Sequence, residues 1–443
     1  MKNWTLKVRN FGKIISADVD IGPFTLFVGD NNSGKSYLMT LIYGLLNVDF
    51  SQFKIDRDTP VYATCDGIIK DKIEEGYGIH HFQQNEFQQF NKLLNEVLEL
   101  NKEEFIRSLF NTTIPIGKIS VELEYDSQFI LVYRLHGIGL ANERNALFCG
   151  IEYEEQFKYL NGVWVNDDFT SSLDTIMLYV LSSMLQTVCD SLINARTIYL
   201  PTSRTGFMLT FKSLIDRSLT EHFNLGESTV KTLLTRPCID FIKTINELSV
   251  KNETGDYADL LSFIETQIID GKVVLNDLPS PDIGYRPNGQ DGKLPLFVTS
   301  GVVTELTPLS LILRYGRFSG IMMEEPEMCL HPKLQWQITR VLIKLVNKGI
   351  PVLISTHSDT ILQHVNNMIK LSNSDNRQEL LTKYNYAADD VLQSSKLQVY
   401  QFETKDHGSH ARKLECDSDG VTVPSFNNML IDMLRESREF TKE

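Results

Sequence analysis

A glycine-rich stretch between an apolar run and a helical pattern constrains this chain more than any other feature. The apolar run Phe24 to Val28 leads into Gly29-Asp-Asn-Asn-Ser-Gly-Lys-Ser36, and a helical pattern follows from Tyr37 to Leu46. This is G-x-x-x-x-G-K-[ST] in the strand–loop–helix context of a P-loop. The glycines let successive backbone N–H groups face a phosphate, and the start of the following helix attracts anions. The stretch therefore predicts a nucleotide-binding loop (Walker A).

The residues of this loop have distinct expected roles. Lys35 is expected to reach the β- and γ-phosphates, and the Ser36 hydroxyl is expected to complete the shell of a Mg²⁺ ion. The predicted ligands are therefore ATP and Mg²⁺. The residues expected to bind the nucleotide are Gly29, Asn31, Asn32, Ser33, Gly34, Lys35, Ser36 and Tyr37.

Polar residues also follow two predicted buried strands near the other end of the chain. The run Gly320-Ile-Met-Met leads to Glu324 and Glu325, and the run Pro351-Val-Leu-Ile-Ser leads through Thr356 to His357. The carboxyl ends of parallel strands form the ligand-binding edge of such sheets. Glu324 is expected to hold the Mg²⁺, directly or through water, and Glu325 to deprotonate the water that attacks the γ-phosphate. His357 is expected to sense the γ-phosphate and position that water.

Taken together, these motifs resemble the ABC-type ATPase heads of the OLD, RecF and SMC group. The resemblance covers about Met1 to Leu46 and Leu296 to Leu371. It implies an α/β fold: a mixed sheet with the P-loop, flanked by helices and interrupted by a largely helical insertion. It also implies a signature loop at Ser300 and Gly301, which would contact the γ-phosphate held by a second subunit in a head-to-head dimer.

The sequence departs from that group in three places. Walker B reads Glu324-Glu325 instead of Asp-Glu, a variant found among OLD-like ATPases, and no full L-S-G-G-Q is present. A Q-loop glutamine is not identifiable. Tyr199-Leu-Pro-Thr-Ser-Arg204 resembles the Tyr-x-Pro-x-x-Arg loop of OLD-like members at that place. Whether Arg204 touches nucleotide or a partner, or is a solvated loop residue, stays open.

The same resemblance, with the local patterns, divides the chain into five segments. Helical patterns run from about Phe207 to Leu248 and from Val303 to Tyr315, and Leu296 to Thr299 reads as a short strand. The segments are 1–47 (first half of the head, Walker A), 48–113 (helical insertion), 114–170 (β-rich part of the head), 171–295 (helical domain) and 296–443 (second half of the head, with signature, Walker B and His357).

Composition limits the class of protein. The 443 residues are 42% hydrophobic and carry a formal net charge of −14, whereas proteins that grip nucleic acid are usually basic. No apolar run is long enough to span a membrane, and the six cysteines are scattered, which suits a reducing cytoplasm. Protein partners are therefore expected, with no membrane and with nucleic acid not the primary partner.

The tail contains one Asp-x-Asp motif, Asp417-Ser-Asp419. It reads as a polar turn and not as a Toprim metal site, so no nuclease site is expected.

Two functions from different classes fit these observations. The first function is a slow ATPase subunit of a bacterial anti-phage defence complex. It would resemble stand-alone OLD-like ATPases such as AriA of PARIS and PtuA of Septu, which oligomerise and hold a separate effector or nuclease until a phage trigger acts. The alternative is a RecF-like repair ATPase acting as an ATP-gated DNA clamp.

Overall fold

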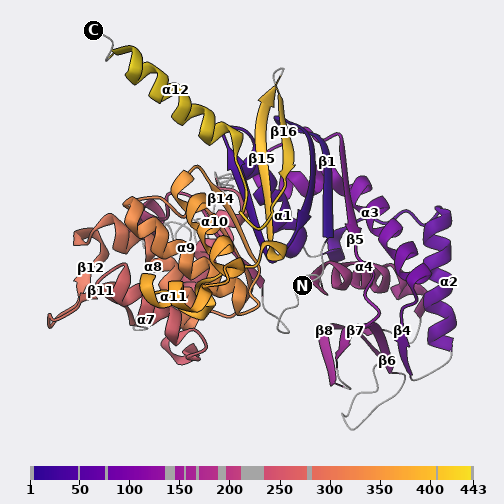
Figure 1. The fold of residues 1–443 in the computed structure, drawn as a ribbon. Coiled ribbons are helices and arrows are strands. Elements are labelled where there is room, and N and C mark those ends of the chain that lie inside the picture. Colours follow the sequence, from indigo (N-terminus) through magenta and orange to yellow (C-terminus); the bar gives the residue numbers. More distant parts are fainter. Residues whose placement is uncertain are drawn as a thin grey trace, which may run out of the picture. The chain divides into compact units, whose positions relative to one another are not determined.

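A nine-stranded mixed sheet is the main feature of the computed structural model, which describes residues 4–47, 50–74, 78–134, 145–153, 156–165, 169–187, 196–210, 234–276, 282–405 and 408–440. Its strand order is β5-β1-β2-β16-β15-β3-β14-β13-β9 (Figure 1). The predicted α/β class, with a mixed sheet that carries a P-loop, is confirmed. Parts of the predicted helical domain, residues 188–195, 211–233 and 277–281, lie outside the described residues.

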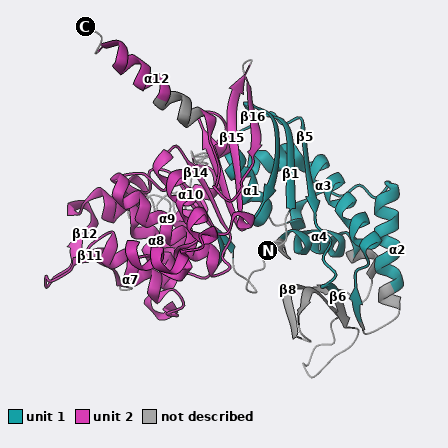
Figure 2. Ribbon diagram, in the orientation of Figure 1, with its two compact units in different colours: residues 1–22, 38–197, 318–320 teal, residues 23–37, 198–317, 321–443 magenta. Residues whose placement is uncertain are grey.

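The chain divides into two compact units that alternate along the sequence (Figure 2). Unit 1 comprises residues 1–22, 38–197 and 318–320, and unit 2 comprises residues 23–37, 198–317 and 321–443. Both halves of the predicted nucleotide site fall in unit 2, which brings together segments from the two ends of the chain.

Unit 1 combines antiparallel strands with helices. Strands β1 and β2 pair with each other, and β1 also pairs with β5; buried and more accessible positions alternate from Trp4 to Arg9 and from Ala17 to Ile21. A separate four-stranded sheet has the order β4-β6-β7-β8. The elements are β1 (Trp4–Phe11), β2 (Ile14–Ile21), η1 (Phe50–Gln52), α2 (Pro60–Glu74), β4 (Gly78–His81), α3 (Gln84–Phe110), β5 (Lys118–Leu123), β6 (Phe129–Arg134), β7 (Asn145–Tyr153), β8 (Gln156–Val165) and α4 (Phe169–Thr187).

Unit 2 contains the parallel strands that carry the site. Three elements, α1 (Lys35–Asn47), β9 (Arg196–Leu200) and β13 (Phe318–Glu324), have residues in both units. The other elements of unit 2 are β3 (Phe24–Gly29), α6 (Arg236–Glu247), η2 (Val250–Asn252), α7 (Ala258–Gln267), β10 (Gly271–Asn276), β11 (Asp282–Pro287), β12 (Leu294–Pro295), η3 (Leu296–Val298), α8 (Gly301–Tyr315), α9 (Pro332–Asn347), β14 (Val352–Thr356), α10 (Asp359–Asn373), α11 (Arg377–Tyr384), η4 (Ala388–Asp390), η5 (Ser394–Lys396), β15 (Leu397–Lys405), β16 (Gly408–Leu414) and α12 (Pro424–Phe440).

Three adjacent strands of unit 2 run parallel, and this sets the place of the site. In β3, β13 and β14 every residue is buried, which explains their predominantly apolar sequences. The register pairs Glu324 with Ser355, and Ser355 with Phe27. The residues that follow these strands therefore emerge at one edge of the sheet.

None of the described helices is long and apolar enough to cross a bilayer.

One local prediction is wrong. The predicted strand from Leu296 to Thr299 is instead the 3₁₀-helix η3, because extended pairing with β11 stops at Pro295. The Thr299 N–H and hydroxyl both donate to the Leu296 carbonyl oxygen, at 3.1 and 2.7 Å, and close the turn. The turn predicted at Asp417 is confirmed, because the Asp419 N–H donates to the Asp417 carboxylate at 2.7 Å.

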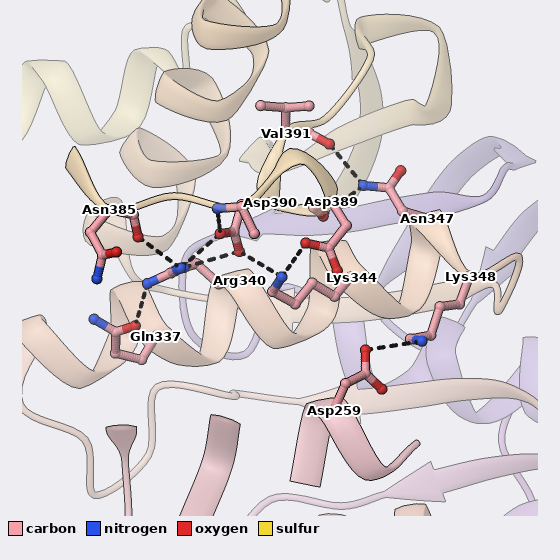
Figure 3. A network of polar contacts seen from close by, with 11 residues as sticks. Asp259, Gln337, Arg340, Lys344, Asn347, Lys348, Asn385, Asp389, Asp390 and Val391 are labelled. Carbon is pink, nitrogen blue, oxygen red and sulfur yellow. Dashed lines mark hydrogen bonds and ion pairs between the residues drawn. The ribbon is translucent and has the colours of Figure 1, made fainter. Parts of the chain in front are cut away.

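Helix α9 follows the Walker B loop and is fixed by a buried ion network (Figure 3). Arg340 donates to both oxygens of Asp390, at 3.0 and 2.7 Å, and Lys344 lies 3.4 Å from the same carboxylate. Asp390 is fully buried. Burial alone would raise its pKa, but the Arg340 hydrogen bonds hold the pKa below the ordinary value. The pair thus connects α9 to η4.

Removing Arg340 is expected to destabilise the fold strongly. Arg340→Met leaves the more distant Lys344 as the only cation beside Asp390 among the described residues, with the Ala387 N–H as a further hydrogen-bond donor. The free energy of unfolding should therefore fall by about 3 kcal/mol. Lys348→Met is the control, because its ion pair with Asp259 is much more exposed and should matter by less than about 1 kcal/mol. Urea unfolding of both variants checks this, and equal losses would contradict it.

Candidate functional site

The backbone of the P-loop requires glycine at Gly29. This residue has φ +127°, and a Cβ there would lie 2.5 Å from the Phe402 carbonyl oxygen of neighbouring β15. Gly34, with φ +96°, also adopts a conformation that L-residues rarely reach, and Asn32 lies in the left-handed region at φ +59°. The loop therefore curls between β3 and α1 as the motif predicts.

The Lys35 side chain is buried inside the curved P-loop. It is 5% exposed, and its ammonium donates to the carbonyl oxygens of Gly29 and Asp30, at 2.9 and 2.7 Å. The third contact is the Ser33 hydroxyl at 3.2 Å. Burial lowers the pKa of Lys35 to about 8, although Glu325 and Asp30 oppose the shift. In contrast, the predicted contact residues Asn31, Asn32, Ser36 and Tyr37 are exposed to solvent.

The pKa of Lys35 predicts how ATP affinity depends on pH. A triphosphate stabilises the ammonium form, so above pH 8 the free protein must take up a proton when it binds ATP. Affinity should be nearly constant just below pH 8 and fall about tenfold per pH unit well above it. Titration calorimetry at pH 9 in two buffers of different ionisation enthalpy measures this proton uptake. Binding without proton uptake at pH 9 would contradict the prediction.

Glu324 ends strand β13 with one carboxylate oxygen unpaired. Its Oε2 accepts from the Thr202 N–H at 3.1 Å, whereas its buried Oε1 has no hydrogen-bond partner among the described residues. An unpaired buried carboxylate oxygen lowers the stability of the folded protein unless a ligand binds to it. Among the described residues no three His, Cys, Asp or Glu side chains cluster to hold a metal alone. The unpaired Glu324 oxygen suits Mg²⁺, which usually binds one or two protein groups and completes its shell with phosphate oxygens and water.

Glu325 follows in an unusual backbone conformation. Its φ of +42° is in the left-handed region, which costs a non-glycine residue of order 1 kcal/mol. Its carboxylate Oε1 lies 3.8 Å from the His357 Nε2, and both side chains are 30% exposed. Burial, together with the charge of Glu324, raises the pKa of Glu325, while Lys35 and Arg204 oppose that rise.

The loop that carries His357 is held by Glu327. One Glu327 oxygen accepts from the His357 N–H at 2.7 Å, and both lie 2.9 Å from the Thr356 hydroxyl. Burial and the nearby Lys35 lower the pKa of His357, so its imidazole is neutral at neutral pH. The pKa of Glu327 itself is raised, mainly by burial. The predicted residues Lys35, Glu324, Glu325 and His357 thus lie at one sheet edge.

The predicted signature residues start helix α8. Ser300 is its N-cap, with the hydroxyl accepting from the Val303 N–H at 3.4 Å, and Gly301 is the first helical residue. Phe297 and Val298, just before this cap, are 75% and 55% exposed. A helix start capped this way presents backbone N–H groups to an anion.

Arg204 corrects an open expectation from the sequence. It is neither solvated nor free to reach a nucleotide, because it is completely buried and bonded to protein groups. Its partner Glu305 lies in α8, and sequence reasoning missed it. The clue in the sequence was a single acidic residue, Glu305, in a helix that is otherwise apolar over most of its length. In the structure every residue of this helix from Val303 to Tyr315 is buried. Glu327 and the Thr202 N–H were also missed.

Comparison with known proteins gives one family match. A family model described as an AAA ATPase domain (AAA_15) matches residues 1–268, and no curated protein sequence matches the chain. The SMC head domain from Thermotoga maritima is 12% identical with a TM-score of 0.34, covering 94% of this chain and 100% of that one. An SmcHead bound to the C-winged helix domain of ScpA is 11% identical with a TM-score of 0.36, covering 94% and 98%. An Smc head domain bound to the C-terminal domain of ScpA, derived from Pyrococcus furiosus, is 12% identical with a TM-score of 0.34, covering 99% of each chain.

Proposed function

Because the chain belongs to the AAA ATPase domain family (AAA_15), we propose that it binds ATP with Mg²⁺ and hydrolyses it at the edge formed by β3, β13 and β14. The observation that carries this proposal is the convergence of a P-loop lysine, two carboxylates and a histidine from three adjacent parallel strands. A phosphate-binding loop alone would support binding. A carboxylate with a raised pKa beside that loop supports hydrolysis as well.

The chemistry divides among five residues. Lys35 would neutralise the β- and γ-phosphate oxygens, for which its contacts with the P-loop carbonyls already hold it in place. Glu325 would accept the proton of the attacking water, and the neutral His357 beside it would orient that water. Ser36 and the unpaired Glu324 oxygen would hold Mg²⁺, which neutralises charge on the phosphates when bound.

A second copy of the chain would complete the site. The N-terminus of α8 at Ser300 and Gly301 suits contact with the γ-phosphate held by another subunit. The exposed Phe297 and Val298 beside it would gain burial in such a head-to-head dimer. ATP binding would then favour the closed dimer, because only ATP supplies the γ-phosphate that both subunits contact.

We further propose that this ATPase is the subunit of an anti-phage defence complex that holds a separate effector or nuclease. The support is the resemblance of Glu324-Glu325 and of the Tyr199 to Arg204 loop to OLD-like ATPases, together with the acidic charge of −14. A phage-derived trigger would change what the oligomer holds.

The test is the native mass of Glu325→Gln protein in ATP and Mg²⁺, produced with its neighbouring genes intact. A large assembly with a stoichiometric second protein supports the defence complex and identifies the effector. A bare dimer that retains DNA with salt-sensitive affinity, together with wild-type ATPase activity that DNA stimulates, overturns it in favour of a RecF-like clamp. Phage protection by Glu325→Gln and Lys35→Ala variants equal to wild type also overturns it.

A further inference from the structure

A buried arginine lies directly behind the end of the Walker B strand. One terminal nitrogen of Arg204 donates to the carbonyl oxygens of Pro201 and Glu324, at 2.9 and 2.6 Å. The other donates to the Glu325 carbonyl oxygen at 3.0 Å and lies 2.7 Å from the Glu305 carboxylate. One guanidinium therefore contacts two consecutive backbone carbonyls of the proposed catalytic segment.

Arg204 is itself held in a fixed orientation by helix α8. Both Arg204 and Glu305 are essentially inaccessible to solvent, at 0% and 1% exposed side-chain area. The other oxygen of Glu305 accepts from the N–H and the hydroxyl of Thr205, at 3.0 and 2.7 Å. The rigid fork of a guanidinium can pair with a carboxylate and donate to three backbone carbonyls at once, which a lysine ammonium cannot do in the same geometry.

The backbone of Glu325 needs such support. Its left-handed conformation, at φ +42°, persists only where the surroundings determine it. The Glu325 N–H donates to the Ser355 carbonyl oxygen at 2.8 Å, and the Glu325 carbonyl also accepts from the Met328 N–H at 3.1 Å. Arg204 adds the contact that connects this strained residue to a second element, helix α8.

We propose that Arg204, oriented by Glu305, is a positioning residue that holds the main chain of Glu325 in the conformation required for ATP hydrolysis. Arg204 acts only through the backbone of Glu325 and touches neither nucleotide nor water. The inference rests on the proposed function, because it needs Glu325 to be the catalytic base. It assigns the buried pair a role in turnover beyond any role in stability.

A stability role alone would not require this geometry. Buried ion pairs can often be replaced by apolar side chains at little cost in stability. The pair between Arg340 and Asp390 offers a matched comparison in the same unit. It also joins an arginine to a fully buried carboxylate, but the other hydrogen bonds of Arg340 among the described residues go to Gln337 and the Asn385 carbonyl oxygen, and not to the backbone of Glu324 or Glu325.

The test compares two double variants in the full-length protein. Arg204→Met/Glu305→Met removes both buried charges, and we expect kcat for ATP to fall about 10- to 100-fold with KM and the affinity for a non-hydrolysable ATP analogue unchanged within about twofold. Arg340→Met/Asp390→Leu is the control, with kcat expected within about twofold of wild type. Urea unfolding of both variants shows how much stability each one has lost.

A conservative single variant keeps the test decisive if the double variant fails to fold. Arg204→Lys keeps the charge beside Glu305 but cannot reach both carbonyls, so kcat should fall about 5- to 20-fold. Wild-type kcat in folded Arg204→Lys or in the folded double variant would overturn the inference. If Glu325→Gln also hydrolyses ATP at the wild-type rate, the proposed function fails. If Glu325→Gln is inactive while the Arg204 variants are fully active, only the inference fails.

Discussion

Replacing Glu325 with glutamine is expected to slow ATP hydrolysis by about 100- to 10,000-fold while ATP stays bound. The amide cannot accept the proton of the attacking water, and it keeps the size of the side chain beside His357. Single-turnover hydrolysis and equilibrium binding of ATP measure the two effects separately. Glu379→Gln is the matched control, because it makes the same charge change at an exposed position of α11.

The pH profile gives a second readout for the same variant. The carboxylate must be ionised to act as a base, and its pKa is raised by burial and by Glu324. The rate should therefore fall, as pH decreases, at a higher pH than an ordinary glutamate would give. A Glu325→Gln variant with wild-type turnover and an unchanged acid limb would remove Glu325 from the mechanism.

The parts of the site that the sequence predicts are those built from local segments. The P-loop lies within one strand–loop–helix unit, so its glycines and Lys35 can be read directly from neighbouring residues. Glu324, Glu325 and His357 each lie at or just after the end of a mainly apolar strand, and parallel pairing brings the ends of such strands to one edge. This prediction requires only that the strands pair in parallel, and no other contact between distant segments has to be known.

The parts that the sequence does not predict depend on contacts between distant segments. Arg204 and Glu305 are about a hundred positions apart, and nothing in either local pattern shows that they form one buried pair. Glu327 is visible in the motif, but its bonds to the loop of His357 appear only when β13 and β14 are adjacent. The error at Leu296 to Thr299 has a local cause, since an apolar run of that length fits a strand and a 3₁₀-helix equally well.

Replacing Lys35 with methionine is expected to have opposite effects on binding and on stability. Methionine cannot neutralise the phosphates, so ATP affinity should fall by at least about 100-fold, as expected for the loss of a desolvated charge contact. The free energy of unfolding at pH 7 should rise by about 1–3 kcal/mol, because burial of the charged ammonium costs stability that its hydrogen bonds only partly return. Equilibrium binding and urea unfolding measure the two quantities.

The pH dependence separates this charge effect from packing. The pKa of Lys35 is about 8 in the folded protein, lowered from 10.5, so between these values the unfolded chain binds more protons. Wild-type stability should therefore rise with pH across this interval, and the advantage of Lys35→Met should shrink by pH 10. Lys251→Met, at an exposed position, is the control and should show no such convergence. A constant difference between Lys35→Met and wild type from pH 7 to 10 would mean that the contacts of Lys35 fully offset its desolvation. Burial of the Lys35 ammonium in the P-loop would then not lower the free energy of unfolding of the nucleotide-free protein.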